Sequence, residues 1–594
     1  MNFYNYNGFI NIYKQSGWTS MDVCAKLKGI LGVKRIGHAG TLDPMAEGVL
    51  PVAVGRATKD IDLIGNGVKE YRAGMLLGIE TETEDITGSI ISVNGKKTDK
   101  AALDTSCSGQ KALEEAASGI DKAALPSEED VKAAIMSFVG VYEQLTPKYS
   151  ARKVNGKKLY EYARAGIEVE RKKKTVEILG ITIDSIDLPH VTFTVRCSKG
   201  TYIRSLCRDI GEKLGCGACM ESLLRTRVGD FGLEDALRLD EISGLKEKGE
   251  LDSAFRIIAP TAVAIGKFDG THIGHQALLK ELKKLADRNR LKTCVIMFRF
   301  AKSSVLSDTE RKRKMYELGI DYCIELQFDD RMRNMSAEDF LEKILIGRYN
   351  MKAIAGGEDV SFGKDRRGDA DFLKEHAGEY GYSVHLIKKI SIDLNKTAED
   401  PGTQEYIADN GEVYKGEKDA ELKTSSNLSE ADTVISSTLL RAELIKGDML
   451  HVTRLLGTPY AISGLVVHGR HIGTDRLSAP TLNIAVPRGL ILPPNGVYAV
   501  NVIIYDGKTG AVKTSGRGIA NLGVAPTVNG EDENGSLRLE THVFEDIGDC
   551  YGKDARVELC YFIRHERMFE SISELKNQVF CSDIPEAKKY FDMA

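Results

Sequence analysis

The sequence has no apolar run near the roughly 20 residues that a membrane-spanning helix requires. Its start, MNFYNYNGFINIYK, lacks the basic and apolar regions of a signal peptide, so we expect a cytoplasmic protein with no membrane partner. Only 11 cysteines occur in 594 residues, and they form no regular framework, which favours reduced thiols over disulfides. No GxxxxGK[ST] motif is present, which excludes a P-loop kinase.

One close cysteine pair remains, Cys216 and Cys219 in CGAC. It has the spacing of half a zinc site or of a redox motif. No second CxxC or CxxH follows nearby, so two unligated thiols are the favoured interpretation.

The length is several times that of one domain of roughly 100 to 200 residues, so we expect three or four domains. A net charge of -5 is ordinary for a globular protein. Residues 94–130 and 395–432 are polar with few large apolar side chains, which predicts two surface insertions. A charged stretch, 239–255, precedes the apolar run IIAPTAVAIG, which predicts a new strand and a domain boundary.

One carboxylate, Asp43, stands inside the glycine-rich stretch GHAGTLDPMAEGVL. Glycines let the backbone turn tightly and Pro44 fixes the exit, so we expect Asp43 on a loop. Capping of the next turn is the alternative role for an aspartate before proline. The later stretch CSKGTYIRSLCRDIG (197–211) predicts a strand, a turn and a helix with Arg204. Such an arginine can hold a buried carboxylate ionised.

Residues 146–175 are strongly basic, with ten Lys or Arg against three Glu. Tyr149, Tyr160 and Tyr162 are interleaved with these charges. Basic side chains supply affinity for phosphate and aromatic rings stack on extruded bases, so the segment indicates binding to structured RNA. A solvated helix face is the alternative.

Four ordered motifs resemble the bacterial tRNA pseudouridine-55 synthase over residues 8 to about 240: GHAGTLDPMAEGVLPVAVGRATK, KEYRAGMLLGIETETED, YSARKVNGKKLYEYAR and CSKGTYIRSLCRDIG. The resemblance implies an α+β fold that needs no metal or cofactor. It implies that Asp43 is the catalytic aspartate, as nucleophile at the ribose C1′ or as base at C2′, with Arg204 as its ion-pair partner. The pocket for the flipped uracil would hold Tyr71, which stacks, and Tyr160 and Lys14.

This family usually continues past a segment like FGLEDALRLDEI into a small RNA-binding domain, whereas here the next strand is expected almost at once. Weaker affinity for tRNA would follow. An RNA-binding module without turnover is the alternative from another functional class.

The middle of the chain contains AVAIGKFDGTHIGHQALLKELKKLA (262–286), which predicts a strand, a glycine turn and an amphipathic helix. His272 and His275 stand at the start of that helix, where backbone N–H groups and the dipole favour an anion. Metal ligation at i, i+3 is the alternative, but no third ligand is obvious nearby.

This pattern resembles the nucleotidyltransferase superfamily. With AGGEDVSFGKDRRGD (355–369) and ISSTLLR (435–441), it resembles the FMN adenylyltransferase half of bifunctional FAD synthetase, with a Rossmann-like α/β fold. In-line AMP transfer from ATP, helped by hydrogen-bond donors and Mg²⁺, would follow. Where the family has a proline-rich turn with histidine, this chain reads RFAKSS. The implied nucleotide site comprises His272, His275, Asp269, Ser437, Thr438 and Arg441.

From residue 462 onward, short apolar runs broken by Gly and Pro predict a small β-barrel, followed by one helix near SISELKNQVF. APTLNI, ANLGVAPTVNG and LRLETHVFEDIGDCYGK resemble riboflavin kinase over about 460–594. Thr481 and Asn483 would bind Mg²⁺ and ATP phosphates, and Glu540 would take the proton of the riboflavin 5′-hydroxyl. A solvent-facing strand residue is the alternative for Glu540. The family's Gly and Phe before PT are Ser478 and Ala479 here.

We therefore expect a multidomain, multifunctional enzyme. Its partners would be tRNA, ATP, riboflavin and FMN, and a degenerate adenylyltransferase half is the alternative. The expected domains are a pseudouridine synthase over 1–245, an FMN adenylyltransferase over 256–455 and a riboflavin kinase over 456–594.

Overall fold

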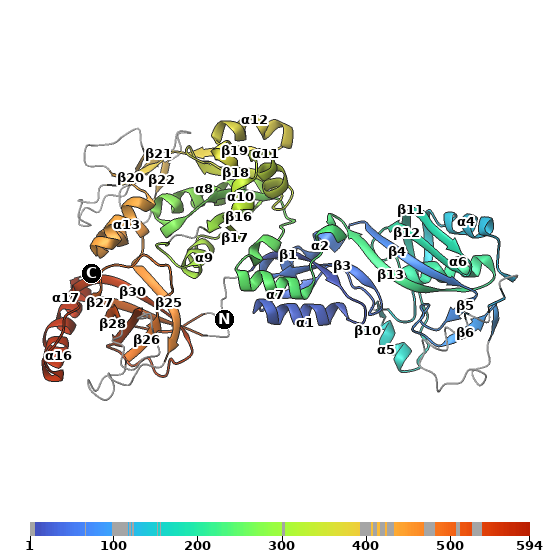
Figure 1. Ribbon diagram of the computed structural model, residues 1–594, viewed down its shortest axis with the longest axis horizontal. Coiled ribbons are helices and arrows are strands. Elements are labelled where there is room, and N and C mark those ends of the chain that lie inside the picture. The colour runs from blue at the N-terminus through green and yellow to red at the C-terminus, as the bar shows by residue number, and fades with distance from the viewer. Residues whose placement is uncertain are drawn as a thin grey trace. The chain divides into compact units, whose positions relative to one another are not determined.

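A computed structural model describes the chain in two compact units, Gly8–Ile258 and Ala259–Ala594, the latter together with Tyr6 and Asn7 (Figure 1). No helix in the described ranges has both the length and the hydrophobicity needed to cross a membrane. The described residues are 6–65, 67–97, 117, 120–121, 124–150, 152–154, 156–299, 303–392, 405–407, 413–415, 422–424, 433–467, 481–506, 511–524 and 537–593.

The unit Gly8–Ile258 is built on one mixed sheet with helices packed against it. Its elements are β1 (Gly8–Lys14), α1 (Ser20–Leu31), β2 (Ile36–His38), β3 (Glu47–Val54), η1 (Gly55–Asp60), α2 (Ile61–Gly65), β4 (Lys69–Leu77), β5 (Ile79–Thr81), β6 (Ile90–Val93), β7 (Lys96–Lys97), α4 (Glu128–Met136), β8 (Gly140–Leu145), β9 (Lys153–Val154), β10 (Lys157–Lys158), α5 (Leu159–Arg164), β11 (Lys173–Asp187), β12 (His190–Cys197), α6 (Ile203–Leu214), β13 (Ala218–Val228), β14 (Phe231–Gly232), η3 (Leu233–Asp235), α7 (Leu239–Lys248) and η4 (Leu251–Ala254).

The nine-stranded sheet of this unit runs β1-β3-β13-β4-β12-β11-β8, with β2 on β3 and β14 on β13. Helices α4 and α6 cover the face on which odd-numbered residues of β4 point inward (Figure 1). Val131, Leu206 and Ile210 from these helices pack on Met75 and Phe193 of the sheet. This arrangement confirms the α+β fold that the resemblance implies.

Two expectations about this unit differ in detail from the structure. Ile120 lies in the expected insertion 94–130, yet it is buried in a small hydrophobic cluster with Leu76 and Ile79. Most of that insertion falls outside the described residues. The charged stretch 239–255 forms α7 and η4, and α7 packs against α1, so it belongs to the fold of this unit.

The unit from Ala259 begins with a Rossmann-like sheet, as expected. Its elements are β15 (Thr261–Gly266), η5 (Asp269–Thr271), α8 (Ile273–Asn289), β16 (Lys292–Arg299), α9 (Asp308–Glu317), β17 (Tyr322–Gln327), α10 (Asp330–Asn334), α11 (Ala337–Asp339), η6 (Phe340–Ile346), β18 (Met351–Gly357), η7 (Lys364–Arg366), α12 (Ala370–Tyr380), β19 (Ser383–Ile387), β20 (Ile390–Ile392), β21 (Glu405–Ile407), β22 (Val413–Lys415), β23 (Leu422–Thr424), β24 (Thr433–Val434), α13 (Ser437–Lys446) and α14 (Met449–Leu456).

Five parallel strands form this sheet in the order β17-β16-β15-β18-β19. Buried parallel strands need continuous apolar runs, which explains CVIMF in β16 and AVAI in β15. Helix α8 packs on β15, β16 and β18, and its leucines Leu279 and Leu282 are fully buried. Of the expected insertion 395–432, only the strands β21, β22 and β23 are described.

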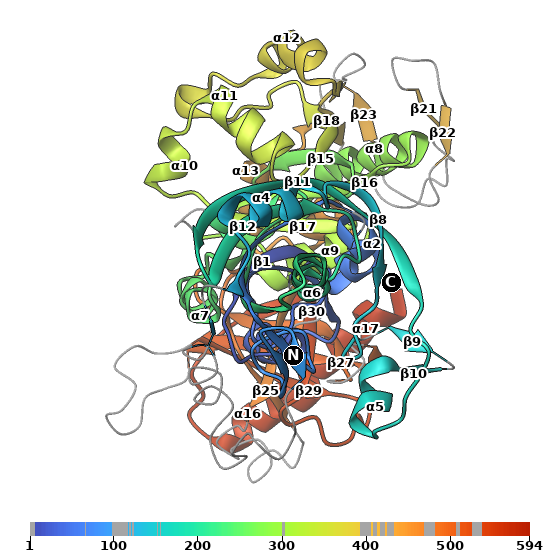
Figure 2. The same ribbon diagram turned by 90° about the vertical axis from the view of Figure 1, so that its right-hand side faces the viewer.

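The last part of the chain is a closed six-stranded barrel, β25-β26-β29-β28-β27-β30, as the spacing of apolar runs predicts. Tyr498, Val500 and Val502 point into the barrel core. The expected single helix is longer than predicted, because α16 continues through η8 into α17 beside the barrel (Figures 1 and 2). These elements are β25 (Tyr460–Val467), β26 (Thr481–Ala485), β27 (Gly496–Tyr505), β28 (Val512–Val524), β29 (Leu537–Val543), β30 (Asp554–His565), α16 (Ile572–Gln578), η8 (Val579–Asp583) and α17 (Ile584–Met593).

The two cysteines of the CGAC pair lie in the interior of the described fold. Cys216 and Cys219 are both free thiols and both buried, and burial raises their pKa values. Within the described part of the chain, neither belongs to a group of side chains close enough to share a metal ion.

Candidate functional site

Asp43 lies on the loop between β2 and β3, facing the first turn of α6. The Nε atom of Arg204 is 2.9 Å from Asp43 Oδ2. The Nε–H group is not aimed closely enough at an acceptor to count as a hydrogen bond, so the contact is an ion pair. The Asp43 side chain is 36% exposed whereas that of Arg204 is 6% exposed. A ligand can therefore reach the carboxylate but not the arginine behind it.

The remaining nitrogens of Arg204 are fixed by the protein. Nη1 donates to the carbonyl of Thr83 at 3.0 Å and Nη2 donates to the carbonyl of Tyr149 at 3.0 Å. Nη1 also lies 3.4 Å from Asp85 Oδ2, and Asp85 is buried. Sequence reasoning did not single out Asp85, because nothing in GIETETED tells which acid turns inward.

Lys14 is fully buried and holds the Asp43 loop from beneath. Its ammonium donates to the carbonyls of Gln15 (2.9 Å), Pro44 (3.1 Å) and Ala46 (2.6 Å), which uses all three N–H groups. The resemblance implies a place in the uracil pocket for Lys14. Its contacts instead support a role in positioning the loop that carries Asp43.

Arg225 of β13 is a second buried cation under this loop, and sequence reasoning missed it. It is 0% exposed and donates to the carbonyls of Val49 (2.7 Å), Gly40 (3.1 Å) and Thr41 (3.4 Å). Carbonyl acceptors orient an arginine without neutralising it, so a full positive charge remains beside the loop.

Tyr71 of β4 pairs with Arg225 across the sheet and points to the same face. Tyr71 is 7% exposed. Burial raises its pKa, and the smaller opposing effect of the Arg225 charge does not cancel that rise. The phenol is therefore neutral, and the ring is enclosed near Asp43. Tyr160 lies in α5, but its side chain is outside the described residues.

Opposing effects act on the pKa of Asp43. Burial raises its pKa, and Asp85 adds to that rise, while Arg204 and Lys14 lower it. Arg204 acts in the expected direction, but the net shift is upward from the ordinary 3.8. The carboxylate is thus more basic than a free aspartate, which suits either a nucleophile or a base.

The two histidines of the middle region meet at the N-terminus of α8, as predicted. Their rings stack with centroids 3.7 Å apart, and His272 Nδ1 accepts the backbone N–H of His275 at 3.3 Å. Burial lowers the pKa of His272 to about 4 and that of His275 well below 6.5. Both imidazoles are neutral near neutral pH, and His272 then carries its proton on Nε2 as a donor.

The turn before this helix is strained, and it collects the other predicted residues. Phe268 and Thr271 have positive φ angles of 47° and 44°, which non-glycine residues rarely adopt. Asp269 accepts the Val305 N–H at 2.8 Å and two N–H groups of Arg441 at 3.1 and 2.5 Å. These contacts bring α13 onto the turn.

Ser437 donates to the carbonyl of Asp269 at 2.9 Å, whereas Thr438 is exposed. Metal ligation by the histidines finds no support among the described residues, since the group able to share an ion is Glu443, Asp448 and His451. Of the altered turn RFAKSS, residues 300–302 lie outside the described part.

In the barrel, Asn483 and Glu540 are direct cross-strand partners of β26 and β29. Asn521 of β28 pairs with Glu540 on the other side, so three polar residues form a row on the outer face. Among the described residues, the buried Asn483 Oδ1 has no hydrogen-bond partner. Sequence reasoning missed Asn521 as a site residue, although it lies in ANLG. The side chain of Thr481, and Ser478 with Ala479, fall outside the described residues.

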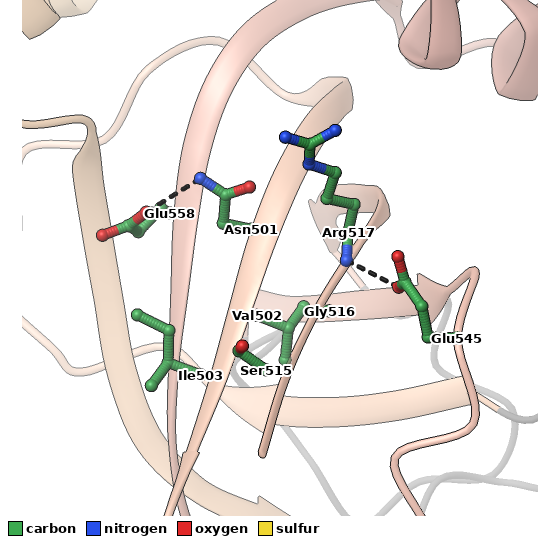
Figure 3. Close-up of a pocket in the computed structure, with 8 residues that line it drawn as sticks. All are labelled: Asn501, Val502, Ile503, Ser515, Gly516, Arg517, Glu545 and Glu558. Atoms are coloured by element: carbon green, nitrogen blue, oxygen red, sulfur yellow. Dashed lines mark hydrogen bonds between the residues drawn. The ribbon is translucent and has the colours of Figure 1, made fainter. Parts of the chain in front are cut away.

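A separate hollow of about 450 Å³ lies on the barrel strands β27, β28 and β30 (Figure 3). Asn501 donates to Glu558 Oε2 at 3.0 Å, and Glu545 accepts the Arg517 backbone N–H at 2.7 Å. None of the predicted site residues lines it.

Comparison with known proteins connects these sites to families. The model of the TruB family pseudouridylate synthase (N terminal domain) matches residues 28–116 and 103–203, and that of the tRNA pseudouridylate synthase B C-terminal domain matches 204–265. The FAD synthetase model matches 256–400, and the riboflavin kinase model matches 456–591.

Curated relatives cover the first part of the chain. The tRNA pseudouridine synthase B of Alkaliphilus oremlandii is 44% identical over 240 residues, 40% of this chain and 71% of the relative. That of Clostridium tetani is 41% identical over 287 residues, 48% of this chain and 88% of the relative. That of Clostridium kluyveri is 45% identical over 234 residues, 39% of this chain and 71% of the relative.

Proposed function

Since the chain belongs to the tRNA pseudouridine synthase B family and continues into FAD synthetase and riboflavin kinase regions, we propose that it isomerises uridine 55 of tRNA to pseudouridine and converts riboflavin through FMN to FAD. The observation that carries the first activity is the accessible Asp43 carboxylate, paired with the enclosed Arg204. The cytoplasm is the proposed compartment.

The isomerisation requires the target base to leave its stack, which costs a few kcal/mol. Tyr71 offers a ring at the site to replace that stacking. The ionised Asp43 breaks the glycosidic bond to uracil N1, either by attack at the ribose C1′ or by removal of a proton at C2′. The detached uracil rotates and re-attaches to C1′ through its C5 atom, which frees Asp43 again and releases the C5 proton. Lys14 and Arg225 fix the loop backbone, so the carboxylate approaches the ribose in one geometry.

The flavin half uses ATP, and we propose that Mg²⁺ accompanies it. Asn483 offers an unpartnered amide oxygen, a ligand type that suits Mg²⁺, and Thr481 precedes it on β26. Bound Mg²⁺ would neutralise phosphate charge. Glu540, exposed on β29 beside Asn483, takes the proton of the riboflavin 5′-hydroxyl.

Adenylylation of FMN is assigned to the α8 N-terminus. His272 donates from Nε2 to the triphosphate, and the first backbone N–H groups of α8 add to the binding. Arg441 and Ser437 reach the same turn from α13.

Two incubations test these assignments. Release of tritium from C5-labelled uridine in a tRNA T-loop measures the synthase, and its absence would reduce the first unit to an RNA-binding module. Riboflavin, ATP and Mg²⁺, followed by chromatography, separate FMN from FAD. FMN without FAD would locate a defect in the adenylyltransferase part.

A further inference from the structure

Lys69, the first residue of β4, is a buried cation that the proposed chemistry leaves without a task. It lies on the same face of the strand as Tyr71, two residues before it, and is 9% exposed. No described residue accepts a hydrogen bond from its ammonium, in contrast to the fully bonded Lys14. Among the described residues, Lys69 Nζ is not one of the fully enclosed polar atoms that lack a partner, so an anion can reach it and supply the acceptors.

The charged groups that act most strongly on Lys69 are cations. Burial lowers the pKa of Lys69 to about 8, and Arg225, Lys199 and Lys174 push in the same direction. The thiol of Cys197, its partner on β12, opposes them. No carboxylate is paired with Lys69 in the described residues, so the site carries an excess of positive charge.

These cations lie at one end of four neighbouring strands of the sheet. Arg225 is on β13, Lys69 on β4, Lys199 just after β12 and Lys174 on β11, and these four strands are consecutive neighbours (Figure 1). Lys174 donates to the carbonyl of Lys199 at 3.0 Å, which ties the far end of the row to the turn after β12. Such a row of positive charges matches an anion that runs across these strand ends.

The same row touches the loop of the catalytic aspartate. A Cβ atom on Gly40, which has φ of 94°, would lie 3.0 Å from Lys69 Nζ and 3.6 Å from Arg225 Nη1. The loop backbone therefore approaches both cations closely, only three residues before Asp43. An anion bound by Lys69 would sit beside the group that reacts with the ribose.

We propose that Lys69 binds a backbone phosphate of the RNA substrate, one of the two that flank the target uridine, and that Lys174 and Lys199 extend this contact across the neighbouring strand ends. The proposal rests on the synthase activity proposed above. A phosphodiester supplies the acceptor oxygens and the negative charge that the site lacks. Lys69 would thereby fix the ribose of the extruded nucleotide over Asp43.

The test uses the full chain and three RNA stem-loops with the T-loop sequence. One is unmodified, and the others carry an uncharged methylphosphonate on either side of the target uridine. Dissociation constants are measured by fluorescence anisotropy over a salt series. For the natural chain, one methylphosphonate should weaken binding about tenfold. Lys69→Met should weaken binding of the unmodified RNA by about the same factor and reduce the salt slope by about 1.

The decisive result is whether the losses of affinity caused by Lys69→Met and by the methylphosphonate add up when the two changes are combined. Lys69→Met should bind the sensitive methylphosphonate RNA no more weakly than the unmodified one, because the lost partners are the same. Lys26→Met, which removes an exposed lysine of α1, should keep the natural sensitivity. If Lys69 only supports the fold, the methylphosphonate penalty will persist in Lys69→Met, and the proposal is wrong.

Two further measurements distinguish a failure of the phosphate site from a folding defect and from a lack of synthase activity. If Lys69→Met does not fold, the natural chain still decides, since indifference to both methylphosphonates would overturn the proposal. Tritium release by the natural chain tests the synthase activity independently. No release together with a sensitive linkage would remove the activity and leave the phosphate site standing.

Discussion

Arg204 binds the Asp43 carboxylate at 2.9 Å through Nε while the carbonyls of Thr83 and Tyr149 hold its other two nitrogens. The backbone carbonyls thus fix the arginine on the side away from Asp43. A planar guanidinium held in this way is poorly replaced by lysine, which is a flexible point charge. Lysine at position 204 would keep the positive charge beside Asp43 but lose the geometry of the guanidinium, so the effects of charge and of geometry can be measured separately.

Substitutions of Asp43 and Arg204 should therefore affect turnover in different ways. We expect Asp43→Asn to abolish tritium release, because the amide is neither nucleophile nor base. Arg204→Lys should keep binding of the RNA but lower kcat by about a hundredfold, since a misplaced carboxylate reacts slowly. The matched control is Asp62→Asn, an exposed aspartate of α2, which should retain full activity. Unchanged turnover in Asp43→Asn would contradict the assignment.

Lys14 should set the acidic limit of the synthase. Lys14 lowers the pKa of Asp43, so its removal leaves that pKa higher still. Because the ionised carboxylate reacts, activity is lost as pH falls through this pKa, and Lys14→Met should lose activity at a higher pH than the natural chain. A profile of kcat/KM from about pH 4 to 8 measures the shift, with Lys26→Met as the control. Coincident profiles would show that Lys14 acts on the loop backbone alone.

The sequence identified the residues proposed to act on substrate more completely than the residues that hold them in place. Asp43 and Arg204 carry the motifs, and the structure brings them together. Lys69, Arg225 and Asp85 escaped notice because their importance depends on burial, and a charged residue in a strand or loop is normally exposed. The closed barrel was predictable from apolar spacing, since each of its strands alternates against one core.

In the adenylyltransferase part, Arg441 is engaged by Asp269. To bind phosphate, Arg441 must exchange the Asp269 carboxylate for a phosphate group. A guanidinium can bind the phosphate through two N–H groups, as it now binds the carboxylate. Arg441→Lys should therefore lower FAD formation about tenfold or more and leave FMN formation unchanged. Arg331→Lys, an exposed arginine of α10, is the control. Chromatography of both products decides, and an equal loss of FMN would contradict the assignment.

The histidines at α8 should not titrate in the working range. Burial lowers the pKa of His272 to about 4, and His275 lies lower than its ordinary 6.5 as well. Both are neutral above these values, so FAD formation should show no inflection between about pH 5.5 and 8 from imidazole protonation. His272→Asn should lower the rate at every pH without changing the shape of the profile. An inflection near the ordinary histidine value, lost in His272→Asn, would show a protonated imidazole at work.

Helix α9 has the composition of a solvated helix, DTERKRKMYE, yet residues 310–315 are buried. Glu310 is the centre of its charges, 2.9 Å from Arg313 Nη2 and 3.0 Å from Arg556 Nε of β30, with Ser463 of β25 as a further donor. Burial alone would raise the pKa of Glu310, but Arg556 and Arg313 bring it below its ordinary 4.5. The carboxylate thus joins the adenylyltransferase part to the barrel.

Glu310→Gln should destabilise this unit by about 3 to 5 kcal/mol, because two buried arginines lose their counter-charge. Glu317→Gln is the matched control on the same helix, since Glu317 pairs with Arg313 but is 56% exposed, and it should cost at most about 1 kcal/mol. Calorimetry measures the transition that riboflavin and ATP shift. A lowered pKa contributes stability above the ordinary value and loses it as pH falls through the folded one, so the deficit of Glu310→Gln should shrink below about pH 4.5. A deficit that stays constant on acidification would mean that packing, and not charge, makes this joint.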